Sequence, residues 1–463
     1  MDNDTQVTLD KAPLSATSLA SKYDANVPRY TSYPTAPHFH KGIGEADYRK
    51  WLAETDRQRP VSLYLHIPFC SQLCWYCGCN TRVVNSHRPV ASYVDTLLKE
   101  IDLTAEAIGG PLKVEALHFG GGTPNILQPD DVDRIFATLR RHFTFTDNAE
   151  IAMEIDPREL TAEFVAAARR NGLNRASVGV QDIDEQVQNA INRQQPWAVT
   201  EGAIKLLRDA NVPSVNVDLL YGLPYQTEAS VRETMRRMIA LQPDRIALFG
   251  YAHVPWMKPA QKLLPEDAMP DSPSRHAQQT AAASMLEDAG YVRIGLDHYA
   301  RASDSMAKAL AAGDVHRNFQ GYTTDGAESL IGFGASAIGK LHGGYVQNMV
   351  AVVEWRAAVA AGKLPVHKGI ALSEDDRLRG AIIEELMCSF RVDLGKFADR
   401  PGLLGDHLQT ELQRLQTFVD DDLLVRNGMN LAVTEAGRPF VRSMAAVFDT
   451  YFGKSSARHS KGV

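Results

Sequence analysis

The chain has 463 residues, of which 44% are hydrophobic and 23% charged, and its formal net charge is −7 at pH 7. This length and composition predict a globular protein with one large core and smaller additions, and the negative charge argues against a protein whose main partner is nucleic acid. No apolar run is long enough to span a membrane, and the acidic start from Met1 to Lys11 lacks the features of a signal or transit peptide. The odd number of cysteines, most of them clustered, argues against disulfides, so we expect a cytoplasmic protein.

The first stretch, to about residue 55, lacks clear helical or strand periodicity. It includes Val27-Pro28-Arg29-Tyr30-Thr31-Ser32-Tyr33-Pro34, where prolines and aromatic residues stand close together. This composition suits an extended strap that lies over another surface, although composition alone favours an ordinary tail. We therefore predict an N-terminal strap over residues 1–55.

Four of the five cysteines follow a short apolar run, Val61–Ile67, which predicts a buried strand. They form the pattern C-x3-C-x2-C with Cys70, Cys74 and Cys77, and Cys79 comes two residues later. Thiolates crowded onto one loop are suited to hold zinc or an iron–sulfur cluster.

The cysteine spacing distinguishes between kinds of metal site. A structural zinc site usually takes two separated C-x2-C pairs, and two-cluster ferredoxins need further cysteines, but only the distant Cys388 remains. A [4Fe–4S] cluster held by three thiolates leaves one iron open to chelate the amino and carboxylate groups of S-adenosylmethionine (SAM). The spacing of Cys70, Cys74 and Cys77 is typical of radical enzymes that cleave SAM reductively. Zinc and buried free thiols stay as alternatives, and Cys79 has no assignment from spacing.

Apolar runs alternate with segments of helical character from Val61 to about Tyr299, within a predicted barrel domain of residues 56–350. This alternation predicts βαβ units with a parallel sheet, and six or seven units in about 240 residues favour a partial (β/α)6 TIM-like barrel over a doubly wound sheet. The predicted strands are Val61–Ile67, Val114–Phe119, Glu150–Ile155, Arg175–Val180, Ser214–Leu220, Arg245–Tyr251 and Tyr291–Gly295.

Glycines, prolines and polar residues gather directly after these predicted strands. In (β/α) barrels the reactive groups lie on the loops that follow the strands, so one site built from all these ends is expected. The Gly120–Gly122 run would let backbone approach a ligand, although a triple glycine is usually only a turn. Glu154 and Asp218 would be costly in a barrel mouth without a partner, but such residues are about as often structural.

The C-terminal part has a different pattern. Residues 315–324 are too irregular for a helix, and Leu330–Leu341 predicts a strand or a glycine-broken turn. Residues 351–463 predict a small, mainly helical domain of winged-helix character. The acidic run Asp420-Asp421-Asp422 favours a packing role for this domain over nucleic-acid binding, and Cys388 fits a core position.

The chain resembles the oxygen-independent coproporphyrinogen III oxidases, a family of radical SAM enzymes. The resemblance extends over nearly the whole chain. Its most specific parts are Cys-Gly-Cys-Asn at 77–80, Gly295-Leu296-Asp297-His298-Tyr299-Ala300 and Arg317-Asn318-Phe319-Gln320-Gly321-Tyr322-Thr323-Thr324. It implies a partial (β/α)6 barrel with additions at both ends, in agreement with the alternation of strands and helices.

The resemblance also implies roles for individual residues. Cys70, Cys74 and Cys77 match the cluster ligands, and the family holds two SAM molecules in one site. The positions that match the first SAM site are Tyr64, Gly121, Glu154 and Ile338. The positions that match the second are Tyr76, Gly122, Thr123, Gln181, Arg193, Asp218 and Ala252; position 76 is Phe in some relatives, and either ring can pack against adenine.

Three residues are expected to act in catalysis: Cys79, Glu154 and Gln320. Cys79 matches a fourth cysteine that the family needs for activity although it does not bind the cluster. Gln320 and the strap around Arg29 and Tyr30 match parts implicated in substrate access and binding. His298, Arg301 and Arg317 are candidate cations for the substrate carboxylates, but sequence alone leaves structural roles equally open.

The implied reaction is the anaerobic oxidative decarboxylation of two propionates of coproporphyrinogen III to vinyl groups, giving protoporphyrinogen IX. A 5′-deoxyadenosyl radical from SAM removes a hydrogen atom from the propionate β-carbon. We expect a monomer that receives electrons from a protein such as a flavodoxin or ferredoxin and binds neither nucleic acid nor membrane. The alternatives are a haem chaperone derived from the same barrel, whose His-Asn-x-x-Tyr-Trp motif and Phe at position 79 are not found here, and a radical enzyme with another substrate.

Overall fold

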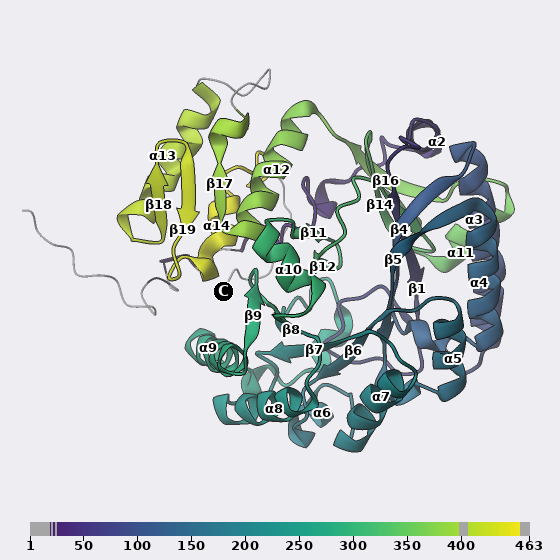
Figure 1. The fold of residues 1–463 in the computed structure, drawn as a ribbon, viewed down its shortest axis with the longest axis horizontal. Helices are drawn as coiled ribbons and strands as arrows, with labels where there is room; N and C mark the ends of the chain where they lie inside the picture. Colours follow the sequence, from purple (N-terminus) through teal and green to yellow (C-terminus); the bar gives the residue numbers. More distant parts are fainter. Residues whose placement is uncertain (1–18, 20–21, 24–25, 398–405, 454–463) are drawn as a thin grey trace, which may run out of the picture.

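The computed structural model describes residues 19, 22–23, 26–397 and 406–453. Most of them form a curved 12-stranded sheet in the order β16-β15-β14-β13-β1-β4-β5-β6-β7-β8-β10-β9, with helices on its outer face (Figure 1). Seven neighbouring strands of this sheet run parallel: β13 (Leu330–Phe333), β1 (Val61–Ile67), β4 (Leu112–Gly121), β5 (Phe143–Ile155), β6 (Arg175–Gln181), β7 (Ser214–Tyr221) and β8 (Arg245–Gly250). The edges are antiparallel: β9 (Tyr291–Ile294), β10 (His298–Arg301), β14 (Ile338–Leu341), β15 (Gly344–Asn348) and β16 (Val366–Ala371).

Helices follow the parallel strands and cover the sheet. Their first turns are fixed locally: Thr227 caps α8 through the Ser230 N–H group, and Pro129 opens α4, where a missing N–H costs nothing. The helices of this part are α2 (Glu45–Ala53), α3 (Arg88–Ile108), α4 (Pro129–His142), α5 (Ala162–Arg170), α6 (Glu185–Ala190), α7 (Trp197–Asp209), α8 (Glu228–Leu241), α9 (Ser272–Asp288), α10 (Ser305–Ala312) and α11 (Val352–Ala360). None of the described helices is long and apolar enough to cross a bilayer.

The predicted partial barrel is confirmed. All six strands predicted from Val61 to Tyr251 are present and pair in parallel in chain order. The seventh predicted strand forms β9, but β9 pairs antiparallel with β10, which in turn pairs antiparallel with β8. The chain reverses at Gly295, whose φ of 58° favours glycine, so this pair closes the sheet edge and does not add a βα unit.

The C-terminal domain is small and rests on its own core. It consists of α12 (Glu374–Ser389), β17 (Arg391–Asp393), α13 (Asp406–Asp420), β18 (Leu424–Asn427), β19 (Asn430–Val433) and α14 (Val441–Ala445). Three helices beside a three-stranded antiparallel sheet agree with the predicted winged-helix character. The sequence placed its start at residue 351, whereas β16 completes the large sheet and α11 contacts α3, so we place the boundary after Ala371.

The N-terminal segment packs into the core of the C-terminal domain. Tyr23, Val27, Tyr30 and Tyr33 are buried there, and the Tyr30 hydroxyl donates to Asp449 Oδ2 at 3.1 Å. The part of the predicted strap before residue 19 lies outside the described residues. The described part therefore joins the two larger units of the chain.

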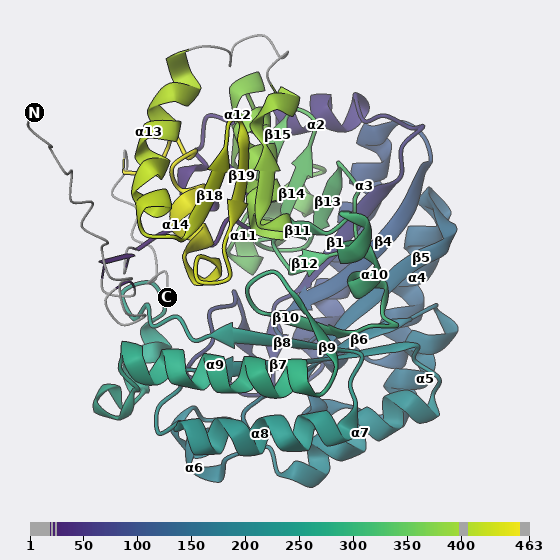
Figure 2. The same cartoon turned by 60° about the vertical axis from the view of Figure 1, so that its left-hand side comes forward.

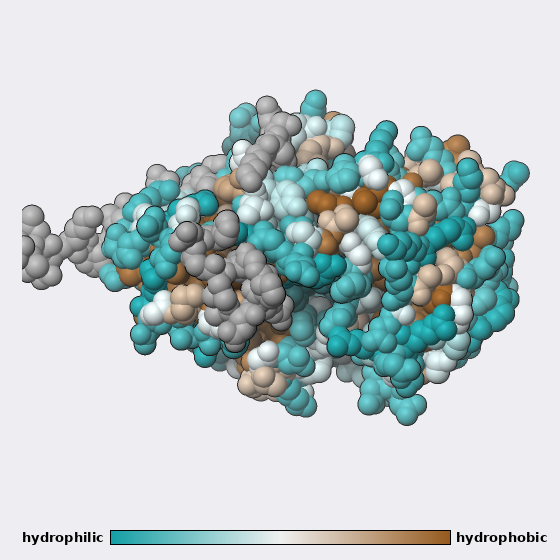
Figure 3. All heavy atoms as spheres, turned by 90° about the horizontal axis from the view of Figure 1, so that it is seen from above, coloured by the Kyte–Doolittle hydropathy of each residue, from teal (hydrophilic) through white to brown (hydrophobic). Residues whose placement is uncertain are grey.

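The face of the molecule shown in Figure 3 is mainly hydrophilic, with small, separate apolar areas.

Glu100 on α3 is a charged residue in the interior, since it is only 1% exposed. Its carboxylate accepts hydrogen bonds from Gly334 N, Asn348 Nδ2 and Trp355 Nε1, at 2.8, 2.6 and 3.0 Å. Burial raises the pKa of Glu100 from 4.5 to about 7, against the opposing effect of these three donors.

Stability should therefore depend on pH through this residue. A raised pKa in the folded protein means that stability is fully present below pH 4.5 and is lost as the pH rises to about 7. We expect Glu100→Gln to remove that loss, so its urea midpoint should fall less than that of the wild type between pH 5 and pH 8. The control is Glu106→Gln, an exposed position on the same helix. Equal pH profiles for wild type and Glu100→Gln would contradict the assignment.

Candidate functional site

The cysteines lie on a loop that leaves the carboxyl end of β1. Two short strands, β2 (Phe69–Cys70) and β3 (Arg82–Val83), pair in parallel and close the base of this loop. Its backbone is fixed by Arg82 N donating to the Pro68 carbonyl and Val84 N donating to the Cys70 carbonyl, both at 3.0 Å. The loop therefore stands at the end of the barrel where a (β/α) fold places its reactive groups.

Cys70 lies between two hydroxyl groups. Its sulfur is 3.1 Å from Thr81 Oγ1 and accepts a hydrogen bond from Thr123 Oγ1 at 3.3 Å. Burial raises the pKa of the Cys70 thiol, and the two hydroxyls act in the opposite direction by stabilising the thiolate. Thr123 belongs to the loop after β4, and its N–H donates to the Phe69 carbonyl at 2.8 Å, which ties the two loops together.

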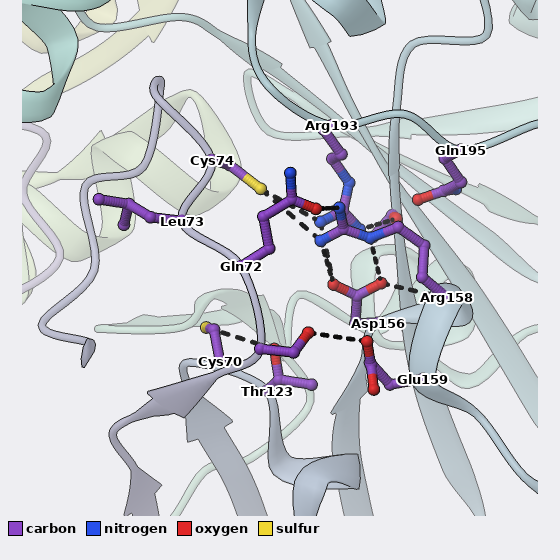
Figure 4. Close-up of polar contacts among 12 residues, drawn as sticks. Cys70, Gln72, Leu73, Cys74, Thr123, Asp156, Arg158, Glu159, Arg193 and Gln195 are labelled. Carbon is purple, nitrogen blue, oxygen red and sulfur yellow. Dashed lines mark hydrogen bonds and ion pairs between the residues drawn. The ribbon is translucent and has the colours of Figure 1, made fainter. Parts of the chain in front are cut away.

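Cys74 faces two guanidinium groups (Figure 4). Arg193 Nη1 lies 3.5 Å and Arg158 Nη2 3.8 Å from its sulfur, and both arginines also bind the carboxylate of Asp156, at 3.1 and 2.7 Å. Arg193 Nη2 donates to the Gly179 carbonyl at 2.6 Å. Burial works against ionisation of Asp156, but Arg158 and Arg193 prevail and lower its pKa. Asp156 thus fixes both cations beside a cluster-ligand candidate.

Cys77 and Cys79 contact each other at the far side of the loop. The backbone N–H of Cys79 lies 3.4 Å from Cys77 Sγ, and Lys258 Nζ donates to the Cys79 carbonyl at 3.1 Å. The hydrogen bond from the Cys79 thiol lowers the pKa of Cys77 to about 7, against the effect of burial. Cys79 itself is exposed.

These surroundings fit an iron–sulfur cluster. In a [4Fe–4S] cluster each thiolate binds a different iron, so the sulfurs need not meet at one point. Donors at Cys70, Cys74 and Cys77 suit thiolates that carry negative charge.

The residues matched to the first SAM lie around the end of β4. Gly121 N donates to Glu154 Oε2 at 3.1 Å, and its φ of 114° favours glycine. A Cβ at Gly120 would lie 2.9 Å from Glu154 and 3.1 Å from the ring of Tyr64, so those two side chains border the same glycine. Ile338 opens β14 and packs against the cluster of Phe39 and Tyr345. Its carbonyl oxygen would lie 2.8 Å from a Cβ at Gly332, the residue that pairs with Tyr64 across β1 and β13.

Gly122 lets the β4 loop approach the cysteine loop. A Cβ there would lie 2.5 Å from the Phe69 carbonyl oxygen and 2.6 Å from Thr81 Oγ1, both within the cysteine loop. We expect Gly122→Ala to displace this loop, to cost about 1–3 kcal/mol of stability and to lower the iron bound after anaerobic reconstitution. Gly78→Ala is the matched control, because a Cβ at Gly78 meets nothing within 4 Å. Equal iron content in the two variants would contradict the close-approach argument.

The residues matched to the second SAM come from the cysteine loop, the loop after β4, and later strands and the segments that follow them. Gln181 ends β6 with a φ of 69°, and Asp218 on β7 accepts from Ser177 Oγ and Asn216 Nδ2 at 2.7 and 2.8 Å. Burial raises the pKa of Asp218 to about 6, against these two donors. Gln261 links the remaining two positions, since its Nε2 donates to the carbonyls of Tyr76 at 3.0 Å and Ala252 at 3.4 Å.

The structure brings some of these predicted residues into contact and leaves others apart. Contacts join Cys70 to Thr123, Cys74 to Arg193 and Gly121 to Glu154. Gln320 lies in the turn of the hairpin β11 (His316–Asn318) and β12 (Gly321–Thr323), where its N–H donates to Asn318 Oδ1. Within the part of the chain that the structure describes, no hydrogen bond joins Gln320 to the residues around the cysteine loop.

Sequence reasoning did not assign Asp156 and Arg158 to the site. Both stand directly after β5, separated only by Pro157, at a strand end where reactive groups are expected. The signal was therefore present in the strand-end pattern, but the contact with Cys74 depends on how three loops meet in space.

Comparisons with known proteins agree with this geometry. The chain matches the Radical SAM superfamily over residues 64–238 and the HemN C-terminal domain over residues 372–440. It is 48% identical over 446 residues to an oxygen-independent coproporphyrinogen III oxidase of Bradyrhizobium diazoefficiens, covering 96% of this chain and 99% of that protein. It is 38% identical to the protein of the same name from Salmonella typhimurium, covering 94% and 95%.

A solved structure gives the same answer. The radical SAM enzyme HemN, the coproporphyrinogen III oxidase of Escherichia coli, is 36% identical to this chain and superposes with a TM-score of 0.88. The match covers 92% of this chain and 100% of that one. The sequence, the barrel with its cysteine loop and the C-terminal domain thus agree, and the chain belongs to the oxygen-independent coproporphyrinogen III oxidase family of radical SAM enzymes.

Proposed function

We propose that this protein converts coproporphyrinogen III to protoporphyrinogen IX without oxygen, by oxidative decarboxylation of two propionates to vinyl groups in haem biosynthesis. The observation that carries the proposal is the similarity to proteins named for this activity along almost the full chain, cysteine loop included. The family implies a [4Fe–4S] cluster and SAM. When bound, they supply a carbon-centred radical able to remove a hydrogen atom from the substrate.

Individual residues then take these roles. Cys70, Cys74 and Cys77 hold the cluster, and the N–H of Gly121 with the carboxylate of Glu154 orients the amino-acid end of a first SAM. A second SAM lies beside it, against Tyr76 and Arg193. The remaining residues of the two SAM sites are Tyr64, Gly122, Thr123, Gln181, Asp218, Ala252 and Ile338.

Cys79 and Gln320 serve the substrate side. Cys79 is exposed on the cysteine loop, and its backbone N–H lies 3.4 Å from Cys77 Sγ. We assign its thiol the handling of a proton or hydrogen atom near the reacting carbon. Gln320 lies on a hairpin turn and takes part in substrate binding. The protein acts as a monomer in the cytoplasm and receives electrons from a flavodoxin or ferredoxin.

Anaerobic turnover tests the proposal. Reconstituted protein, SAM, a reductant and coproporphyrinogen III should release carbon dioxide and 5′-deoxyadenosine together, and protoporphyrinogen IX should accumulate. Tight haem binding without release of carbon dioxide would favour the haem chaperone instead. Formation of 5′-deoxyadenosine with no change in the porphyrinogen would indicate a different substrate.

A further inference from the structure

A pocket lies beside the barrel mouth where three parts of the chain meet. Its volume is about 470 Å³, and four arginines line it: Arg29 of the N-terminal segment, Arg275 of α9, Arg317 of β11 and Arg442 of α14. α14 faces the α9 side of the barrel across it (Figure 2). Four cations gathered from four elements in one concave site are typical of anion recognition.

These arginines bind backbone carbonyls where a carboxylate would be expected. Arg29 donates to the Gly250 carbonyl at 3.1 Å, and Arg275 donates to the Tyr251 carbonyl at 2.8 Å. Arg317 donates to the Arg29 carbonyl at 3.2 Å. Within the described residues, no carboxylate lies within ion-pair distance of any of these three guanidinium groups.

Two of the guanidinium groups also have buried N–H groups without a partner. Arg275 Nε and Arg317 Nη1 are shielded from solvent and meet no acceptor in the part of the chain that the structure describes. A buried donor left unpaired loses its hydrogen bond to water without replacement, so such groups are usually kept for a ligand or an ordered water.

The charges that face the pocket do not balance. Its acidic residues are Asp271 and Asp297, against four arginines. Asp271 caps α9 through the Ser274 N–H group. Burial works against ionisation of Asp297, but its hydrogen bond from His298 and the charges of Arg317 and Arg29 lower its pKa. Arginines thus outnumber carboxylates among the described residues that line the pocket. Burial, together with the repulsion of Arg29 and Arg317, lowers the pKa of Arg442 to about 10.

The pocket adjoins the cysteine loop. One of its walls is Tyr251-Ala252, at the carboxyl end of β8, and Tyr251 packs in one apolar cluster with Trp75 and Tyr76 of that loop. A ligand anchored at the arginines can therefore extend along this wall toward the candidate cluster site.

We propose that this arginine pocket binds two propionate carboxylates of the porphyrinogen, the pair that the product keeps. The inference rests on the proposed function and adds the groups that orient the substrate. A propionate that decarboxylates loses its charge and would leave buried guanidinium groups unpaired, whereas the two retained propionates keep both ion pairs throughout the reaction. It also gives the N-terminal segment and the C-terminal domain a role, since each supplies one arginine.

Steady-state kinetics of the reconstituted enzyme test this role. We expect Arg317→Gln and Arg275→Gln each to raise the KM for coproporphyrinogen III roughly tenfold or more, with a smaller change in kcat. Arg391→Gln is the matched control, because this substitution removes the same charge at an exposed position on β17. Arg317→Lys and Arg275→Lys keep the charge but lose the bidentate geometry of the guanidinium group, so their KM values should lie between those of the wild type and the Gln variants. These Lys variants also keep the test valid if a Gln variant does not fold.

Equilibrium binding distinguishes failure of the pocket from failure of the proposed function. Fluorescence titration of the holoenzyme should show tight binding of coproporphyrin III and of protoporphyrin IX, which carries only the retained pair, and weak binding of the coproporphyrin tetramethyl ester. Two results would overturn the role of the pocket while leaving the proposed function intact. One is that the ester binds as tightly as the free acid. The other is that the KM is unchanged in all four arginine variants while the wild type turns over. A wild type that binds these porphyrins through the arginines but releases no carbon dioxide would overturn the proposed function and leave the pocket standing.

Discussion

Replacing Cys74 with alanine is expected to remove the cluster and all SAM-dependent chemistry. Cys74 is a buried member of the three-cysteine set, and Arg193 and Arg158 face its sulfur. Without it, two thiolates would remain for a cluster that needs three protein ligands, and two guanidinium groups would lose an anionic neighbour. Anaerobically reconstituted wild type should contain about four irons per chain, whereas Cys74→Ala should contain almost none and form no 5′-deoxyadenosine.

Cys79→Ala is the control that separates ligation from chemistry. It removes one thiol from the same loop, two residues from Cys77, at an exposed position. We expect this variant to keep its iron and to lose porphyrinogen turnover. If Cys74→Ala kept the iron of the wild type, or if Cys79→Ala lost it, the ligand assignment would be wrong.

The fold was predictable because its signals are local. Apolar runs such as Val61–Ile67 are buried whichever strand they pair with, and the helices between them force parallel pairing. The sequence-based predictions differ from the structure where strand pairing decides which sheet or unit a segment joins. Tyr291–Gly295 has the composition of a barrel strand, but its partner β10 comes from the chain reversal at Gly295. Val366–Ala371 follows a helix, and only its pairing with β15 shows that it belongs to the large sheet.

The residues of the site also fall into those that a local motif predicts and those that only long-range packing brings together. The four clustered cysteines fall within ten residues of one another, and the three glycines around the end of β4 are consecutive, so the spacing within each group carries the information. The contacts of Asp156 with Arg193 join positions 37 residues apart, and the pocket joins Arg29 to Arg442 across almost the whole chain. Such encounters depend on how loops and domains pack, and a single arginine in a sequence is most simply a solvated one.

The second large effect is expected at Arg193, whose charge stabilises Asp156 in the interior. Arg193 is 5% exposed and Asp156 is 9% exposed, so loss of the cation leaves the carboxylate with Arg158 alone. We expect Arg193→Gln to lower the free energy of unfolding by about 3 kcal/mol and to reduce cluster retention at Cys74. Arg170→Gln, which breaks the exposed pair with Asp133, should change the urea midpoint very little.

The pH dependence distinguishes this electrostatic effect from simple loss of packing. In the wild type the pKa of Asp156 is lowered, so its contribution is present above the ordinary aspartate pKa of 3.8 and is lost as the pH falls below it. In Arg193→Gln the effect of burial is opposed by one cation fewer, which raises that pKa. The difference in unfolding free energy between the two proteins should therefore be largest near pH 7 and shrink toward pH 4. A difference that stays constant over this range would mean that Arg193 acts through packing alone.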